Sequence, residues 1–213
     1  DRLVQVMDEL DLVIPRASLG AVHGRVVDVR EEEQVRQGVD DVLLRLGHVD
    51  ILINNAGAFG PVKSMLAYSL EEWEEVMRVN LTSQFLVCRA LVPHMVASKY
   101  GRIVNMASVV GRNANPMAPA YSAAKAGVIC FTQALGRDLA KTGVLVNCVA
   151  PAATKTAFFD GVSQEYLDKM LAQVPMGRFG TVEDVAALVC WLASKDCSYS
   201  TGAVFDCSGG RHG

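Results

Sequence analysis

The chain has 213 residues, of which 51% are hydrophobic and 20% charged, which is enough to bury the core of one globular domain. Its formal net charge is -3 and its basic residues form no stripe, so the pattern of a nucleic-acid-binding protein is absent. No apolar stretch reaches the roughly 18 residues that a membrane span needs, and residues 1–10 lack the apolar centre of a signal peptide.

The first half of the chain alternates strand-length apolar runs with longer stretches of helical period. Residues 21–29 (AVHGRVVDV) are predicted as a strand, and residues 31–46 as a helix. The predicted helix carries one apolar face, formed by Val35, Val39, Val42, Leu43 and Leu46. Residues 51–53 (ILI) are predicted as a strand that ends in the run NNAG.

The second half repeats this alternation. Ser69 and Glu72 form a capping box that opens a long helix over 70–98, and Thr181 and Asp184 open another. The latter places Val185, Leu188, Val189 and Leu192 on one buried face. Further predicted elements are strands at 102–108, 144–151 and 203–208 and a helix at 120–141. This order is typical of a parallel α/β sheet, and strands apolar on both faces, such as 51–53 and 144–151, predict helices on both sides.

The cysteines indicate a reducing compartment. Cys88, Cys130, Cys148 and Cys190 lie inside apolar runs and are predicted to be small buried hydrophobic residues. The sequence has no C-x-x-C, and its four histidines are scattered without ligand spacing, which argues against a metal site. We therefore expect a cytoplasmic protein.

A tyrosine and a lysine in the segment APAYSAAKAG (118–127) carry the first chemical signal. Tyr121 and Lys125 are four residues apart, so they lie on one face of the predicted helix. An ammonium near a phenol, whose pKa is ordinarily ~10, favours the phenolate and lowers that pKa. The pair would make a tuned acid/base, but an ordinary surface pair on an amphipathic helix has the same spacing, so the context must decide.

Polar or small residues follow three predicted strands at the same edge of the sheet. Ser108 ends the strand at 102–108, residues 54–57 follow the strand at 51–53, and Pro151 ends the strand at 144–151. Parallel α/β proteins bind ligands at this edge. Asn80 is a polar residue inside an apolar helical stretch, where its amide needs a partner.

Together these residues identify a resemblance to a known family. NNAG (54–57), Asn80 in VNL, Ser108, Tyr121-x-x-x-Lys125 and residues 151–156 resemble the short-chain dehydrogenase/reductase family in order and spacing, from the first residue to about residue 210. The resemblance implies a Rossmann-type doubly wound parallel sheet, with 1–213 forming a single NAD(P)-binding domain. The helices at 70–98 and 120–141 are more apolar than one sheet face requires, which predicts a homo-oligomer with twofold symmetry, and the resemblance implies a tetramer.

The resemblance assigns four catalytic residues. Tyr121 would be the general acid/base that exchanges a proton with the substrate oxygen, and Ser108 would hydrogen-bond that oxygen. Lys125 would lower the pKa of Tyr121 and hold the nicotinamide ribose. Asn80 would anchor a water and proton relay through a local break in its helix. Ser108 and Tyr121 are thus also the expected substrate-binding residues.

The resemblance also assigns the contacts of an NAD or NADP cofactor. Asp28 and Val29 would contact the adenine, the segment Asn54, Asn55, Ala56, Gly57 would form the ribose wall, and Tyr121 and Lys125 would face the ribose and nicotinamide. The nicotinamide carboxamide would lie against Pro151, Ala152, Thr154 and Thr156. The family usually has Pro-Gly where this chain has Pro151-Ala152, a change that is tolerable if Ala152 keeps a negative φ.

The family's first strand, its glycine-rich turn T-G-x-x-x-G-I-G and its second strand have no counterpart in the sequence. Without two neighbouring strands, the predicted strand at 21–29 would have nothing to pair with. We therefore expect that further residues precede Asp1, and that an intact mass above 22.9 kDa would show it. The residue that separates NAD from NADP lies in that missing region of the family pattern.

Two substrate classes resemble parts of the sequence. APAYSAAKAG and VPMGRFG are similar to 3-oxoacyl-carrier-protein reductases, the first expectation, whereas PAATKT and FDCSGGR are similar to enzymes acting on 2-keto-3-deoxy sugar acids. The segment 154–180 is the expected substrate lid, with Phe158, Phe159 and Met170 as apolar and Lys155 and Arg178 as charged candidates. A non-catalytic dinucleotide-binding protein is a further alternative. A hydrolase using Ser108 is disfavoured, because there is no G-x-S-x-G turn.

Overall fold

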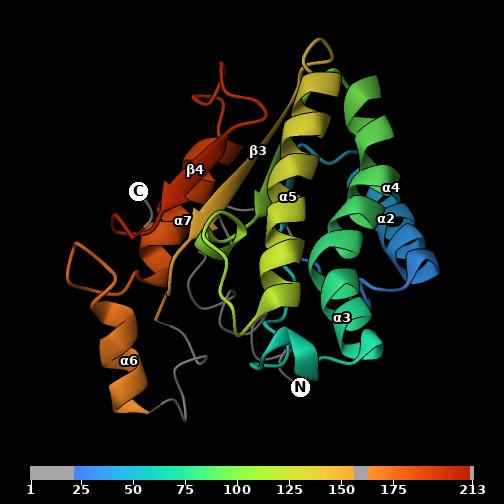
Figure 1. Cartoon of the computed structure of the whole chain (residues 1–213). Helices are drawn as coiled ribbons and strands as arrows, with labels where there is room; N and C mark the ends of the chain where they lie inside the picture. The colour runs from blue at the N-terminus through green and yellow to red at the C-terminus, as the bar shows by residue number, and fades with distance from the viewer. Residues whose placement is uncertain (1–21, 156–162, 212–213) are drawn as a thin grey trace.

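The computed structural model describes residues 22–155 and 163–211 (Figure 1). Within them, one parallel sheet contains β1 (Ile51–Asn54), β2 (Gly101–Met106), β3 (Val144–Pro151) and β4 (Val204–Cys207) in the order β1-β2-β3-β4. The pairing Ile51 to Arg102, Gly101 to Val144 and Cys148 to Val204 sets the register. The predicted α/β class with a parallel sheet is confirmed.

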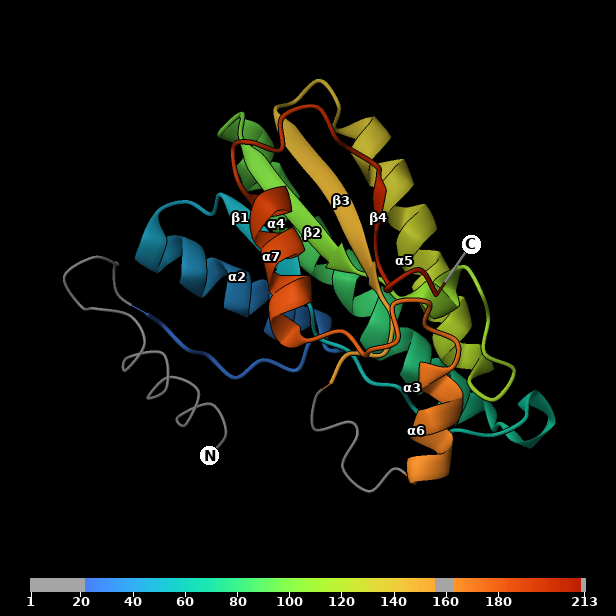
Figure 2. The ribbon, with the colours of Figure 1, turned by 90° about the vertical axis from the view of Figure 1, so that its left-hand side faces the viewer.

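Helices cover both faces of this sheet. The α-helices are α2 (Glu32–Leu46), α3 (Leu70–Met77), α4 (Ser83–Ala97), α5 (Pro119–Asp138), α6 (Gln164–Leu171) and α7 (Val182–Ala193). Shorter elements are the 3-10 turns η1 (Met65–Ala67) and η3 (Val109–Gly111) and the π-helical turn η2 (Arg78–Thr82). α4 and α5 lie on one face and α7 on the other, and α2 packs beside α4 (Figures 1 and 2).

Local sequence signals set the helix starts. The Ser69 hydroxyl accepts a hydrogen bond from the Glu72 amide at 3.2 Å, and the Glu72 carboxylate accepts one from the Ser69 amide at 2.8 Å. Thr181 and Asp184 form the same reciprocal pair at the start of α7. Both predicted capping boxes are therefore present, and each satisfies amide groups that the first turn leaves without a helical partner.

The central strands form the core. β2 is buried along its whole length, and β3 is buried except at residues 145 and 151. On one side, Leu91 and Met95 of α4 pack with Ile103 and Val146, and on the other, Leu192 of α7 packs against Val104 and Val149. The predicted apolar face of α7 is therefore confirmed, as is the coverage of the central strands on both sides.

Several expectations about the elements are corrected. Residues 22–29 form no strand: no described strand hydrogen-bonds to them, and the Asp28 amide donates to the Gln34 side chain instead. β1 is an edge of the described sheet, so Ile51 and Ile53 are 46% and 38% exposed rather than covered. Cys130 and Cys190 are exposed, because they lie on outward faces of α5 and α7, while Cys88 and Cys148 are buried as predicted.

Candidate active site

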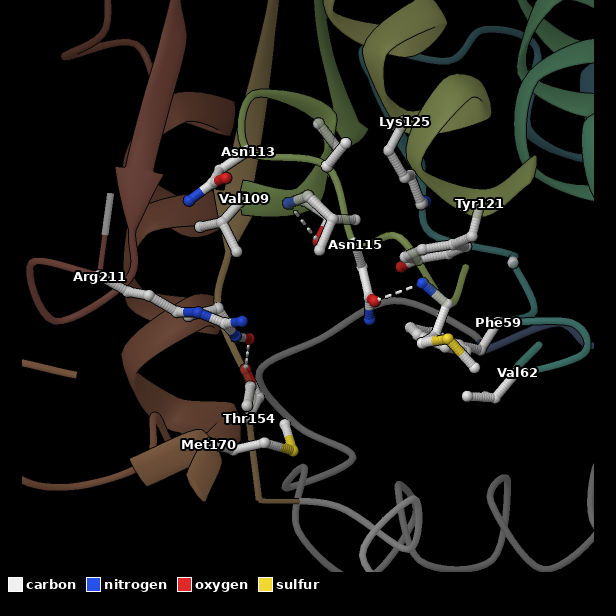
Figure 3. A pocket seen from close by; sticks show the side chains of 18 of the residues that line it. Phe59, Val62, Val109, Asn113, Asn115, Tyr121, Lys125, Thr154, Met170 and Arg211 are labelled. Carbon is white, nitrogen blue, oxygen red and sulfur yellow. Dashed lines mark hydrogen bonds between the residues drawn. The ribbon is translucent and has the colours of Figure 1, made fainter. Parts of the chain in front are cut away.

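A cavity of about 820 Å³ opens at the carboxyl ends of β1, β2 and β3 (Figure 3). Segments that follow these strands form its wall, which places it at the edge where parallel α/β sheets bind ligands. The predicted site residues that line it are Asn55, Gly57, Asn80, Ser108, Tyr121, Lys125, Ala152 and Thr154.

Tyr121 enters the cavity from the first turn of α5, which Pro119 opens. Its ring packs against that of Phe59, with centroids 4.6 Å apart. Burial raises the pKa of Tyr121 above its ordinary value, and a hydrogen bond with Ser108 opposes this rise. Burial outweighs any lowering of the phenol pKa by the nearby Lys125, so the net effect of the described surroundings is to keep the proton on Tyr121.

Lys125 lies one turn further along α5 and is 3% exposed. Its Nζ donates a hydrogen bond of 2.8 Å to the Met106 carbonyl and lies 5.5 Å from the centre of the Tyr121 ring. Burial lowers the pKa of Lys125 to about 8. The ammonium has N–H donors beyond the one used on Met106, and Lys125 lines the cavity.

Ser108 stands at the turn between β2 and η3. Its hydroxyl donates to the Pro151 carbonyl and accepts from the Val110 amide, both at 3.4 Å. These long hydrogen bonds anchor the side chain at the start of η3, and Ser108 lines the cavity beside Tyr121. The serine and the tyrosine therefore reach the cavity from two different elements.

Asn80 lies fully buried in the π-helical turn η2. Its Nδ2 donates to the carbonyls of Ala58 at 2.8 Å and Val76 at 2.9 Å, and its Oδ1 accepts from the Ala58 amide at 3.3 Å. The expected break of the helix at Asn80 is thus a π turn, a feature frequent at functional sites. The side chain ties the loop after β1 to this turn.

The small residues noted in the sequence permit close packing around Tyr121 and Lys125. A Cβ on Gly57 would lie 2.8 Å from the Asn80 Oδ1, and one on Gly111 would lie 2.7 Å from the main-chain carbon of Lys125. On α5 itself, a Cβ on Gly127 would meet the Leu81 side chain at 2.6 Å. Glycine at 111 and 127 lets η3 and η2 lie against α5, and glycine at 57 lets the loop after β1 lie against Asn80.

Other predicted cofactor residues do not line this cavity. Asn54 is buried, and its Nδ2 donates to the Asn105 Oδ1 at 2.9 Å, so its amide belongs to the core. The Asp28 carboxylate accepts from Arg30, which lowers the pKa of Asp28 to about 2. Ala56, Pro151 and Val29 also lie outside the cavity wall, with Val29 lining a separate hollow beside α2. Thr156 lies outside the described residues.

The departure at Pro151-Ala152 proves compatible with the local backbone. Among the described non-glycine residues only Lys99 has a positive φ, so Ala152 meets the condition set for it. The Ala152 amide donates to the Cys207 carbonyl at 3.1 Å, and the Thr154 hydroxyl donates to the Ala152 carbonyl at 3.2 Å. These contacts hold the segment against β4.

Of the residues expected in the substrate lid, some line the cavity and others do not. Met170 of α6 lines the cavity. Arg178 does not, because its guanidinium pairs with the Asp184 carboxylate at 2.7 Å. Lys155 is exposed and lies outside the cavity wall. Phe158 and Phe159 lie outside the described residues.

Several residues of the cavity wall were not singled out as site residues from the sequence. They are Phe59, Val62, Asn113, Asn115, Gln173 and Arg211. Phe59 lies two residues after NNAG, and Arg211 directly follows the C-terminal glycine pair. Their closeness to recognisable motifs was the available signal. Asn113, Asn115 and Gln173 lie in irregular segments that carry no periodic pattern.

Neither a metal centre nor a membrane span was identified in the described part of the chain. Residues 22–155 and 163–211 hold no group of three or more His, Cys, Asp or Glu side chains placed to bind a metal ion. None of the helices within those residues is long and apolar enough to cross a membrane.

The parallel sheet, with a tyrosine, a lysine and a serine gathered at its strand ends, defines an oxidoreductase of the Rossmann type, and comparison with known proteins agrees. A family model described as "Enoyl-(Acyl carrier protein) reductase" matches residues 6–212. The chain belongs to the short-chain dehydrogenase/reductase family, whose members use NAD or NADP.

Relatives within this family carry different names. A 2-dehydro-3-deoxy-L-rhamnonate dehydrogenase (NAD(+)) of Sphingomonas sp. is 42% identical over 200 residues, which cover 94% of this chain and 80% of the relative. A 3-oxoacyl-[acyl-carrier-protein] reductase of Aquifex aeolicus is 42% identical over 188 residues, covering 88% and 75%. The solved structure of an NAD+-bound xylitol dehydrogenase superposes with a TM-score of 0.82 at 31% identity, covering 87% of this chain and 78% of that one.

Proposed function

We propose that this protein interconverts a secondary alcohol and a ketone, with Tyr121 as the acid/base. The observation that carries the proposal is the meeting of four side chains around one cavity: Tyr121 and Lys125 of α5, Ser108 at the start of η3, and Asn80 of η2. A protein that only binds a dinucleotide has no need of a buried phenol beside a serine hydroxyl. The non-catalytic alternative is therefore disfavoured.

The surroundings of Tyr121 suit proton donation to a developing alkoxide. Because burial raises the pKa of Tyr121, its phenol is protonated at neutral pH and can give its proton to the substrate oxygen during ketone reduction. Ser108 would donate a hydrogen bond to that same oxygen and stabilise the charge that develops on it. In alcohol oxidation the phenolate of Tyr121 would accept the proton of the alcohol, while Ser108 would keep its hydrogen bond to the same oxygen.

Lys125 and Asn80 would support this proton transfer. The buried ammonium of Lys125 stabilises a phenolate on Tyr121 once that phenolate forms, since opposite charges attract strongly in a dry site. Asn80 fixes the loop that follows β1, and its π turn would anchor the water and proton relay. Both roles depend on the close packing that the glycines allow.

The residues present fit the nicotinamide half of NAD or NADP. Gly57 presents a wall without a side chain 3.6 Å from the Lys125 Nζ, measured from the place of a Cβ, and Lys125 keeps donors for ribose hydroxyls. We propose that Asn55, Gly57, Tyr121, Lys125, Ala152 and Thr154 hold this half. Asp28, Val29, Asn54, Ala56, Pro151 and Thr156 remain proposed contacts or supports on the family pattern alone. When bound, the nicotinamide supplies the hydride acceptor or donor.

Two substrate classes are proposed from the relatives. A 3-oxoacyl group on an acyl carrier protein is the class named for the Aquifex aeolicus relative, and a 2-keto-3-deoxy sugar acid is the class named for the Sphingomonas relative. The cavity wall combines apolar side chains such as Phe59 and Val62 with the amides of Asn113, Asn115 and Gln173. The amides favour a substrate that carries hydroxyl groups, and hence the sugar acid.

We further propose that residues 1–213 act as one NAD(P)-binding domain in a cytoplasmic homotetramer. The family match over residues 6–212 supports the single domain. The cysteines are free, including the exposed Cys130 and Cys190, which supports a reducing compartment. Subcellular fractionation would test the location.

The function is tested by turnover. The wild-type protein is assayed for appearance or loss of nicotinamide absorbance with NAD and NADP, using 2-keto-3-deoxy sugar acids, acetoacetyl thioesters and simple secondary alcohols. We expect turnover with at least one alcohol or ketone and one of the two cofactors. Binding of NAD(H) or NADP(H) without turnover of any substrate would support the non-catalytic alternative instead.

A further inference from the structure

The cavity wall is unbalanced in charge, and this bears on the substrate class left open above. Its charged members among the described residues are Lys125, Lys169 and Arg211, and none is an aspartate or a glutamate. Lys125 donates to the Met106 carbonyl, and Lys169 pairs with Glu165 at 2.6 Å on α6. Among the described residues, neither Lys125 nor Arg211 has a carboxylate within ion-pair distance. Lys125 lies beside Tyr121, so Arg211 is the cation left for another part of a ligand.

The C-terminal turn holds Arg211 in place. Gly209 and Gly210 have φ values of +63° and +84°, which glycine adopts readily. The Met176 amide donates to the Gly209 carbonyl at 3.1 Å, so this turn is tied to the segment that follows α6. A Cβ on Gly209 would lie 2.9 Å from the Val174 side chain, which shows how closely the two segments pack.

One hydrogen bond orients the guanidinium. The Arg211 Nη2 donates to the Gln173 Oε1 at 2.9 Å. Because a guanidinium has five N–H donors in a planar fork, several remain for a ligand. Figure 3 shows Arg211 and Tyr121 on opposite sides of the pocket, with Asn115 between them. A substrate held at one end by Arg211 would therefore extend towards the phenol.

We propose that Arg211 binds the carboxylate of a small hydroxy-acid or oxo-acid substrate, while Tyr121 serves the carbon that is oxidised or reduced. The guanidinium fork matches a carboxylate through two parallel hydrogen bonds. Asn115 lies between the two ends, and its Oδ1 accepts from the Met117 amide at 2.9 Å, which fixes the amide and leaves its N–H donors for a substrate hydroxyl. This inference rests on the proposed hydride-transfer function and names its substrate class.

The test uses a substrate pair that differs only in charge. A 2-keto-3-deoxy sugar acid and its methyl ester are assayed with the wild-type protein and the Arg211→Ala variant. We expect Arg211→Ala to raise the KM for the acid roughly 10- to 100-fold, since a charge-assisted contact is lost. The ester should lose much less than the acid, because it offers one neutral carbonyl in place of the carboxylate that accepts two parallel hydrogen bonds. Circular dichroism and an unchanged melting temperature show that the variant is folded.

A second variant keeps Arg211 but pairs its guanidinium with a new carboxylate. Gln173→Glu places a carboxylate of the same shape at the atom that Arg211 already contacts. The new ion pair should raise the KM for the acid at least roughly tenfold and change the KM for the ester much less. Gln173→Leu should raise the KM for the acid by a smaller factor.

Each outcome bears on one of the two claims. Equal losses for acid and ester in Arg211→Ala, or an unchanged KM for the acid, would overturn the role of Arg211 while leaving hydride transfer intact. Acetoacetyl-acyl-carrier-protein is assayed alongside with both proteins. A loss of activity in Arg211→Ala that is confined to this substrate would also overturn the role, and would assign Arg211 to the acidic carrier. If the wild-type protein turns over no ketone or alcohol at all, the proposed function itself fails.

Discussion

At the scale of single residues, Lys125 carries the clearest conflict between stability and function. Its ammonium is 3% exposed, has one described hydrogen-bond acceptor, and loses hydration that would favour the charge. Burial lowers the pKa of Lys125 to about 8 from its ordinary value of 10.5. Burying the charged Lys125 therefore lowers the free energy of unfolding at neutral pH, and the proposed chemistry uses that charge.

Replacing Lys125 with methionine should stabilise the protein at pH 7 by up to about 3 kcal/mol and abolish turnover. Below pH 8 the lysine is charged in both the folded and the unfolded state, so the full cost is present. Between about pH 8 and 10.5 the unfolded state binds more protons, so the stability of the wild type rises with pH and the advantage of Lys125→Met shrinks. Urea unfolding at pH 7 and pH 10 measures both differences. If the stability advantage of Lys125→Met over the wild type grew with pH, the pKa of Lys125 would not be lowered by burial.

At the scale of elements, the sequence predicted what local signals encode. The four strands and the starts of α3 and α7 follow from apolar runs and capping boxes. The π turn at Asn80 was expected only as a break in the helix, because its form depends on the bonds of Asn80 to Ala58. Residues 22–29 have strand composition, but composition cannot supply a neighbouring strand.

The contact between η3 and α5 is predicted to be essential at the element scale. In Gly111→Ala the new Cβ would lie 2.7 Å from the Lys125 main chain and push η3, with Ser108 at its start, away from α5. We expect a loss of about 1 to 3 kcal/mol in the free energy of unfolding and a roughly tenfold or larger fall in kcat.

Gly38→Ala is the matched control for this change. Its Cβ would lie 3.1 Å from a Val27 methyl group, a milder contact than the one with the main chain at Gly111, and alanine is the better residue inside α2. Its stability and kcat should stay near those of the wild type. Equal effects from the two substitutions would show that the tight contact at Gly111 has no special role.

At the scale of the whole molecule, α4 has more apolar surface than the sheet can cover. Leu86, Leu91 and Met95 are buried, yet Phe85 on the same helix is 42% exposed beside Phe131 of α5, with ring centroids 6.5 Å apart. A helix that is apolar around its circumference is usually buried on every side. A second copy of the chain, packed over α4 and α5, would bury the outer face.

Phe85→Glu should therefore dissociate the proposed homotetramer. A charge in the centre of an apolar interface opposes association, so sedimentation should show smaller species at micromolar concentration. Glu74→Gln on the exposed surface of α3 is a control that should leave the assembly unchanged. A wild-type protein that sediments as a monomer would refute the assembly outright.

The candidate site was predictable in part at this largest scale. Tyr121, Lys125, Ser108 and Asn80 were expected together, because each lies in a recognisable motif at one edge of the sheet. Gln173 and Arg211 are brought into the cavity only by the packing of the C-terminal turn on the segment after α6. Contacts of this kind follow from the fold and have no local sequence pattern.

The most direct test of the central claim is hydride transfer by Tyr121→Phe, measured by nicotinamide absorbance on whichever substrate the wild type turns over. The same change at Tyr199, whose side chain is fully exposed, is the matched control. We predict that Tyr121→Phe loses roughly 100-fold or more in kcat while its affinity for the nicotinamide cofactor persists, and that Tyr199→Phe keeps wild-type turnover. Unchanged kcat in Tyr121→Phe would contradict the assignment of this phenol as the acid/base.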